Sequence, residues 1–200
     1  MIAVFLAEGF EEIEALSPVD YLRRAKVEVT LVAVTSNNPV DPRIVKSSHG
    51  VSVFADKTLE DFLSGLNGSL PDAVFFPGGL PGATNLAASS DLKNLILKCF
   101  AANKYVTACC ASPALVLAPA GILKGKNWTC YPGMENDVDP EMVEDSEHCS
   151  GVPFVTDGNI VTGSGPGTAE LFAMELVRIF AGEEKAESIR IGSCQRKVSE

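Results

Sequence analysis

Apolar residues occur along the chain in short unbroken runs that alternate with segments of helical spacing. The runs, each typical of a strand buried on both faces of a parallel sheet, cover residues 2–7, 27–34, 73–76 and 105–109. Apolar residues at helical spacing predict helices near residues 13–22, 59–66, 92–100 and 171–180. This alternation predicts a doubly wound, mostly parallel α/β sheet with helices on both faces. Ligands of such folds bind beyond the carboxyl ends of the strands.

Weaker patterns fill the remainder of the chain. They predict a polar loop or edge excursion over residues 35–48, short strands over 51–55 and 128–131, an acidic surface segment over 135–147, and a hairpin over 154–162 that turns at Asp157-Gly158. No linker rich in Pro, Gly or Ser divides the chain, so we expect a single domain over residues 1–200.

Composition narrows the classes of partner. The chain has 16 basic and 26 acidic residues and a formal charge of -10, which disfavours nucleic acid and anionic membranes. Residues 1–7 lack a basic start and a cleavage site, and no apolar run approaches the roughly 18 residues of a membrane helix. We therefore expect a cytoplasmic protein with reduced cysteines. With no C-x-x-C pair and only two histidines, the sequence predicts no metal site.

One cysteine lies where a strand is predicted to turn into a helix. The strand run ends at Cys109, and Ser112-Pro113 then opens an apolar helical pattern, with Ser112 at a plausible N-cap. Cys110 would thus lie in a strand-to-helix turn, where the positive end of a helix stabilises a thiolate. The alternative is a buried structural cysteine.

Other residues are predicted to converge on Cys110 at the same edge of the sheet. Glu14 follows the first strand, and Gly78-Gly79 follow the strand over residues 73–76. The backbone N–H groups of Gly79 and Ala111 could form an anion hole, although a plain tight turn also explains the paired glycines. An anionic sulfur would push Glu14 toward its protonated form, which could donate a hydrogen bond.

Three further features bear on this site. The glycine-rich turn over residues 163–168 lacks the lysine and spacing of a phosphate loop, so an active-site turn is favoured over phosphate binding. Cys109 points away from Cys110 on the strand and is expected in the core, as is Cys130, although either could be a resolving thiol. Neither His49 nor His148 is near the turn in sequence, which disfavours a Cys-His-Asp triad.

Together these motifs resemble the ThiJ/PfpI superfamily, and within it the branch of the Parkinson-disease-associated protein DJ-one. The resemblance runs from residue 1 to about residue 182 and rests on Glu11-Glu12-Ile13-Glu14, Pro18-Val19-Asp20, Arg23-Arg24, Phe76-Pro77-Gly78-Gly79, Ala108-Cys109-Cys110-Ala111-Ser112-Pro113-Ala114 and Gly165-Pro166-Gly167-Thr168. It implies a flavodoxin-like fold, a homodimer and no cofactor. It also implies that Cys110 is the nucleophile and Glu14 its partner carboxyl.

The chain departs from this family at three positions. Tyr131-Pro132 stands where glyoxalase-type members often carry a histidine before a proline, and tyrosine is a poor proton shuttle at neutral pH. Ala111 replaces the histidine of the protease-like branch, so a peptidase is rejected. His49 falls where relatives carry an arginine near the dimer interface, and with Tyr131 and Pro166 it is a candidate accessory residue.

The resemblance leaves two hypotheses. In the first, Cys110 oxidises to a sulfenate or sulfinate, and the protein is a redox sensor or protective chaperone. In the second, Cys110 attacks a small dicarbonyl or its adduct, while Glu14 moves protons, as a cofactor-independent, lactate-forming glyoxalase or a deglycase. The residues favour the first slightly because of Tyr131, and they support no link with thiazole monophosphate biosynthesis.

Overall fold

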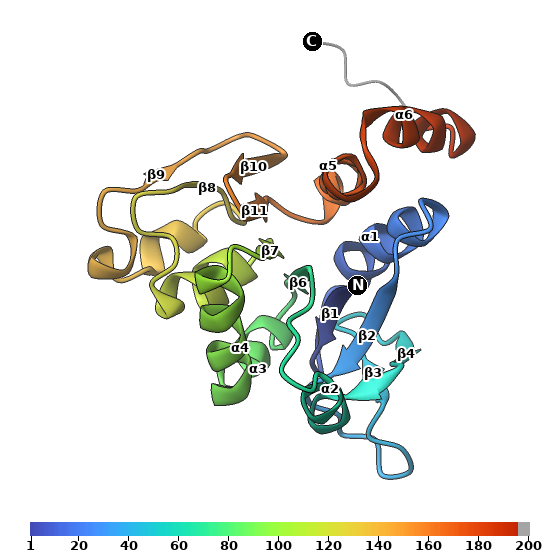
Figure 1. Cartoon of the computed structure of the whole chain (residues 1–200). Coiled ribbons are helices and arrows are strands. Elements are labelled where there is room, and N and C mark those ends of the chain that lie inside the picture. Colours follow the sequence, from blue (N-terminus) through green and yellow to red (C-terminus); the bar gives the residue numbers. More distant parts are fainter. Residues whose placement is uncertain (196–200) are drawn as a thin grey trace.

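A seven-stranded sheet forms the centre of the computed structural model, which describes residues 1–195 (Figure 1). The strand order is β10-β11-β7-β6-β1-β2-β5, and every neighbouring pair is parallel except β10 with β11. The strands are β1 (Ile2–Leu6), β2 (Val29–Ala33), β5 (Lys57–Thr58), β6 (Ala73–Phe76), β7 (Tyr105–Cys109), β10 (Phe154–Asp157) and β11 (Ile160–Gly163). The predicted α/β fold is confirmed, and the expected hairpin is the pair β10 and β11.

Helices cover both faces of this sheet (Figure 1). One face carries α1 (Glu12–Arg24), α5 (Ala169–Ala181) and α6 (Glu183–Gly192), and the other carries α2 (Leu59–Gly65), α3 (Gly82–Ala87) and α4 (Ser90–Ala101). Because strand side chains alternate, each face of the sheet supplies its own buried cluster. Within residues 1–195, no helix is long and apolar enough to cross a membrane.

Two small ribbons lie outside the main sheet. The segment expected as a loop contributes β3 (Ile44–Lys46), which pairs antiparallel with β4 (Ser52–Phe54). The strand expected over residues 128–131 is shorter and shifted, as β8 (Asn127–Trp128), and pairs in parallel with β9 (Glu147–His148). Between them, the acidic segment forms two 3₁₀ turns, Met134–Asp137 and Pro140–Val143. The short strand predicted over residues 51–55 is thereby confirmed as β4. By contrast, β3, β9 and the two 3₁₀ turns are too short for hydrophobic periodicity to reveal them.

The first helix begins before the Ser17-Pro18 pair. The Glu11 side chain accepts a 2.7 Å hydrogen bond from the Glu14 N–H and so caps α1. Pro18 therefore lies inside the helix rather than at its start. This early start places Glu14 in the first turn of α1, next to the carboxyl end of β1.

Candidate active site

Cys110 lies in a sharp turn immediately after β7. Its φ angle is +58°, a left-handed conformation that is uncommon for a residue with a side chain. The turn is held on both sides, because the Cys110 N–H donates to the Gly163 carbonyl and the Cys110 carbonyl accepts from the Tyr131 N–H, each at 2.8 Å. Strained backbone of this kind is typical of functional sites, where the surrounding structure over-determines it. The predicted strand-to-helix elbow is present.

Gly78 lets the loop after β6 approach this turn closely. A Cβ atom on Gly78 would lie 2.6 Å from the Cys110 Cβ and 2.7 Å from Oε2 of Glu14. No side chain fits in that space, so the glycine is required by packing. The neighbouring Gly79 has a φ of +88° and is as tightly enclosed, since a Cβ atom there would lie 2.4 Å from the Glu11 nitrogen.

Glu14 is a fully buried carboxyl at the centre of the site. Its Oε2 accepts a 2.8 Å hydrogen bond from the Gly78 N–H and a 3.6 Å contact from the Cys109 thiol. Among residues 1–195, no group forms a hydrogen bond of normal geometry with the second oxygen, Oε1. Burial raises the pKa of Glu14 to about 7, and the hydrogen bonds from the Cys110 thiol and from Gly78 only partly oppose this rise. The carboxyl can therefore hold or release a proton near neutral pH.

The Cys110 thiol differs from the sequence-based expectation. The elbow pattern predicts a lowered pKa, but burial, followed by the negative charge of Glu14, raises the pKa of this thiol well above its usual range. Hydrogen bonds from the backbone N–H groups of Gly79 and Ala111 lower it in part. Since only 9% of Cys110 is exposed, loss of hydration outweighs these donors. Cys110 and Glu14 form a coupled pair, in which a proton on the carboxyl favours the thiolate.

Ser112 serves a different purpose from the predicted N-cap. Its side chain does not cap the helical turn, which is a π-helical segment, Pro113–Leu117. The hydroxyl instead donates a 2.7 Å hydrogen bond to the carbonyl of Pro77, and Ser112 is fully buried. This bond joins the elbow to the loop that carries Gly78 and Gly79, so it fixes both halves of the expected anion hole.

The three candidate accessory residues, Tyr131, Pro166 and His49, have different surroundings in the structure. Tyr131 is half exposed, and its ring lies over Gly165, next to Pro166 in the 3₁₀ turn Pro166–Thr168. His49 has an exposed side chain, which contacts the Glu12 carboxylate at 3.0 Å. Its pKa is raised by the hydrogen bond to Glu12 and by the charge of that carboxylate.

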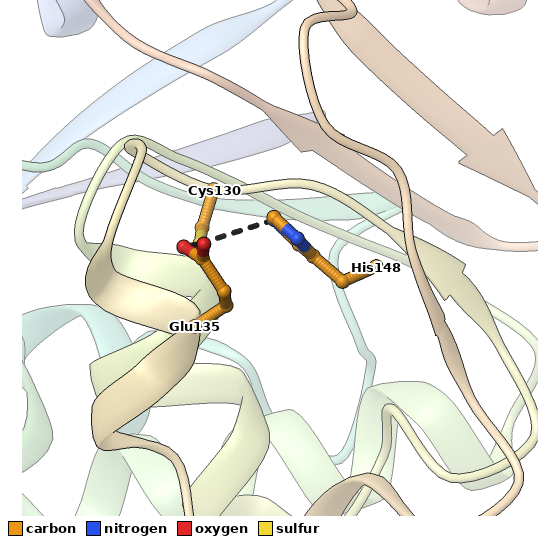
Figure 2. A group of neighbouring side chains, drawn as sticks. All are labelled: Cys130, Glu135 and His148. Carbon is orange, nitrogen blue, oxygen red and sulfur yellow. Dashed lines mark hydrogen bonds between the residues drawn. The ribbon is translucent and has the colours of Figure 1, made fainter.

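Within residues 1–195, two mixed clusters of side chains have donor atoms suited to a metal. They are Cys130, Glu135 and His148, and Glu11, Glu12 and His49. Figure 2 shows the first, in which His148 points toward the thiol of Cys130. The sequence does not reveal this cluster, because His148 reaches Cys130 and Glu135 only through the parallel pairing of β8 with β9.

Comparison with known proteins identifies relatives along nearly the whole chain. A model of the DJ-1/PfpI family matches residues 1–179. Protein DJ-1 homolog B of Arabidopsis thaliana is 39% identical over 184 residues, which are 92% of this chain and 39% of that protein. The chain spans about two fifths of the length of this relative and of homolog A from the same plant, 39% and 43% respectively.

Other relatives match over nearly their full length. The crystal structure of Drosophila melanogaster DJ-1beta has a TM-score of 0.84 at 32% sequence identity, and the alignment covers 98% of each chain. Glutathione-independent glyoxalase DJ-1 of Schizosaccharomyces pombe is 26% identical over 94% of this chain and 95% of that protein. The resemblance predicted from the motifs is thereby confirmed. The chain belongs to the DJ-1/PfpI family and has its flavodoxin-like α/β fold.

Proposed function

We propose that this protein is a DJ-1-like oxidative- and carbonyl-stress protein in which Cys110 is the reactive group. One observation carries the proposal: the Cys110 thiol shares a buried site with the Glu14 carboxyl and the backbone donors of Gly79 and Ala111. A sulfinate is an anion with two acceptor oxygens. Two backbone N–H groups and a protonated carboxyl supply the donors that such an anion needs.

The oxidation proceeds in two steps. The Cys110 thiolate attacks one oxygen of a peroxide, the O–O bond breaks, and the leaving hydroxide takes a proton from Glu14 to become water. The sulfenic acid formed at Cys110 returns its proton to the Glu14 carboxylate and becomes a sulfenate. The sulfenate attacks a second peroxide, the O–O bond breaks, and the leaving hydroxide takes the proton of the new sulfinic acid, which gives a sulfinate and a second water. The fixed negative charge of the sulfinate would raise the pKa of Glu14 further and keep its proton in place.

A second candidate is a glyoxalase, favoured by the pKa of Glu14 near 7 and by the name of the S. pombe relative. A general acid–base works best when its pKa is near the operating pH. The Cys110 sulfur would add to the aldehyde carbon of methylglyoxal, and the Gly79 and Ala111 N–H groups would hold the oxyanion. Glu14 would carry a proton from the first carbon to the second, and water would release lactate. This route needs no histidine at the position of Tyr131.

We further propose a homodimer in the cytoplasm. Ile13 and Val51 are exposed apolar side chains, 53% and 47% accessible, that flank the contact between His49 and Glu12 in the sequence. Exposed apolar residues beside polar ones suit a protein interface. All six cysteines are free thiols, which fits the reducing cytosol.

One paired assay separates the two candidate functions. Purified protein, Cys110→Ser and Glu14→Gln are given methylglyoxal without glutathione, and lactate is measured; parallel samples receive peroxide and intact masses are recorded. Oxygen addition that requires Cys110, without lactate, supports the redox function alone. Lactate formation that is lost in both variants supports the enzyme. If the wild type forms no lactate and gains no oxygen at Cys110, the proposal is refuted.

A further inference from the structure

We propose that Cys130, Glu135 and His148 form a binding site for a thiophilic divalent cation such as Zn²⁺. The three side chains come from the segment after β8, the following 3₁₀ turn and β9. Their donor atoms all lie within 4.8 Å of one another (Figure 2). A thiolate, an imidazole and a carboxylate are the three ligand types that zinc prefers.

The distances are close to those of a tetrahedral site. The Cys130 Sγ lies 3.6 Å from Nε2 of His148 and 3.9 Å from Oε2 of Glu135. Two ligands at zinc's usual bond lengths and a tetrahedral angle are separated by about 3.5 Å. The sulfur and the imidazole already meet this spacing, and a small rotation of the half-buried Glu135 side chain would complete the triangle.

Contacts with neighbouring residues orient two of the three proposed ligands, Glu135 and His148. The Gly133 N–H donates a 2.7 Å hydrogen bond to Oε2 of Glu135. The other nitrogen of His148, Nδ1, lies 3.4 Å from the Ser150 hydroxyl, and the Trp128 ring lies against the imidazole with centroids 4.9 Å apart. Metal-binding histidines are commonly held in this way, with one nitrogen fixed so that the other faces the metal.

Charge and access also suit a cation. A divalent ion bound at Cys130 would release the thiol proton to solvent, and one thiolate with one carboxylate would neutralise the charge of the ion. All three ligands line a cavity of about 440 Å³, which gives the ion a path and leaves a fourth position for water or a small ligand.

The other mixed cluster, Glu11, Glu12 and His49, does not support a zinc site. Glu11 already uses its carboxylate to cap α1, and His49 has an exposed side chain paired with Glu12. None of its three members is a thiol, the ligand that most favours zinc over the harder cations.

Cobalt(II) titration of the chelator-treated, reduced protein tests the site, because thiolate-to-cobalt charge transfer reports a Co–S bond directly. We expect one equivalent to bind with a thiolate band and Zn²⁺ to displace it. Cys130→Ser should abolish the band, and Glu135→Ala should weaken binding by more than about 100-fold, beyond the loss typical of an outer-shell change. His148→Phe should weaken cobalt binding to a similar extent as Glu135→Ala, while it keeps an aromatic ring against Trp128.

Cys110→Ser and Cys149→Ser are the matched controls, since each removes a thiol outside the cluster. Both should bind cobalt as the wild type does. Absence of any thiolate band would overturn the proposal, as would a band that survives in Cys130→Ser and disappears in Cys110→Ser. Because Cys130 is buried, Glu135→Ala provides an independent test at a more exposed position: unchanged cobalt affinity in that variant would also refute the three-ligand site.

Discussion

Oε2 of Glu14 accepts a 2.8 Å hydrogen bond from the backbone N–H of Gly78, a residue 64 positions further along the chain. This bond joins the first turn of α1 to the loop after β6 and buries the carboxyl beside the elbow cysteine. A buried carboxyl is costly to ionise, and the site therefore stores a proton next to Cys110. Several measurable properties depend on that proton.

The first prediction concerns the pH dependence of stability. The pKa of Glu14 in the folded protein is about 7, above its usual 4.5, so the folded state holds this proton more tightly than the unfolded state. The contribution of this proton to the free energy of unfolding is fully present below pH 4.5 and is lost as pH rises through 7. The shift in the pKa of Glu14 from 4.5 to about 7 corresponds to about 3 kcal/mol. Urea unfolding of the wild type and Glu14→Gln at pH 5 and 8 should show the variant gaining relative stability at pH 8. Parallel profiles would contradict the assignment.

A second prediction concerns the reactivity of the thiol. Since the carboxylate of Glu14 raises the pKa of Cys110, Glu14→Gln should lower the midpoint of the pH profile for alkylation by about one unit or more. Iodoacetamide labelling followed by peptide mass spectrometry measures the profile at this residue. Glu12→Gln is the control, because that carboxylate contacts His49 instead. A midpoint unchanged in Glu14→Gln, or lowered equally in Glu12→Gln, would refute the coupling.

Gly78→Ala should damage the site through packing. The added methyl group would lie 2.6 Å from the Cys110 Cβ, so the elbow or the loop must move. We expect a loss of about 1–3 kcal/mol in the free energy of unfolding, together with slower peroxide oxidation of Cys110. Gly167→Ala is the matched control, since a Cβ there meets nothing within 4 Å. Equal stability of the two variants would show that the close approach is unimportant.

The dimer proposal makes a prediction about mass in solution. Val51→Asp places a charge on the exposed apolar surface near His49 and should shift the mass measured by light scattering from dimer toward monomer. Leu97→Asp, on α4, changes a similarly exposed residue, 41% against 47% accessible, on another face of the molecule and should leave the dimer intact. A monomeric wild type at micromolar concentration, or a dimer that persists in Val51→Asp, would contradict the proposed interface.

The sequence predicts β1, β2, β6 and β7 well because each is almost entirely buried and appears as an apolar run. The two-residue edge strand β5 is polar and at least partly exposed, and no pattern in the sequence predicts it. It also predicts that Glu14, Gly78 and Cys110 meet, because all three follow strands whose carboxyl ends share one edge. The site roles proposed for them remain predictions until the variants are measured. Two short helices, α3 and α6, escape prediction, since neither has a clear apolar stripe.

Other properties of the site depend on tertiary contacts that leave no local signal. Ser112 looks like an N-cap in sequence, yet its hydroxyl reaches the Pro77 carbonyl on a neighbouring loop. The raised pKa of Cys110 follows from the depth of burial, which the elbow pattern does not report. Likewise, the sequence predicts that Cys130 is an inert core residue, and only the fold brings it to His148.

Site-resolved oxidation shows whether Cys110 is the reactive cysteine. Limiting peroxide is added to the reduced protein, and the fraction of each of the six cysteines that carries added oxygen is measured by peptide mass spectrometry. Accessibility alone favours Cys194, which is exposed, and Cys149, which is partly exposed, over Cys110 at 9%. We predict the reverse: a sulfinate forms first at Cys110 and accumulates less in Glu14→Gln. Oxidation that follows exposure, with Cys110 last, would contradict it.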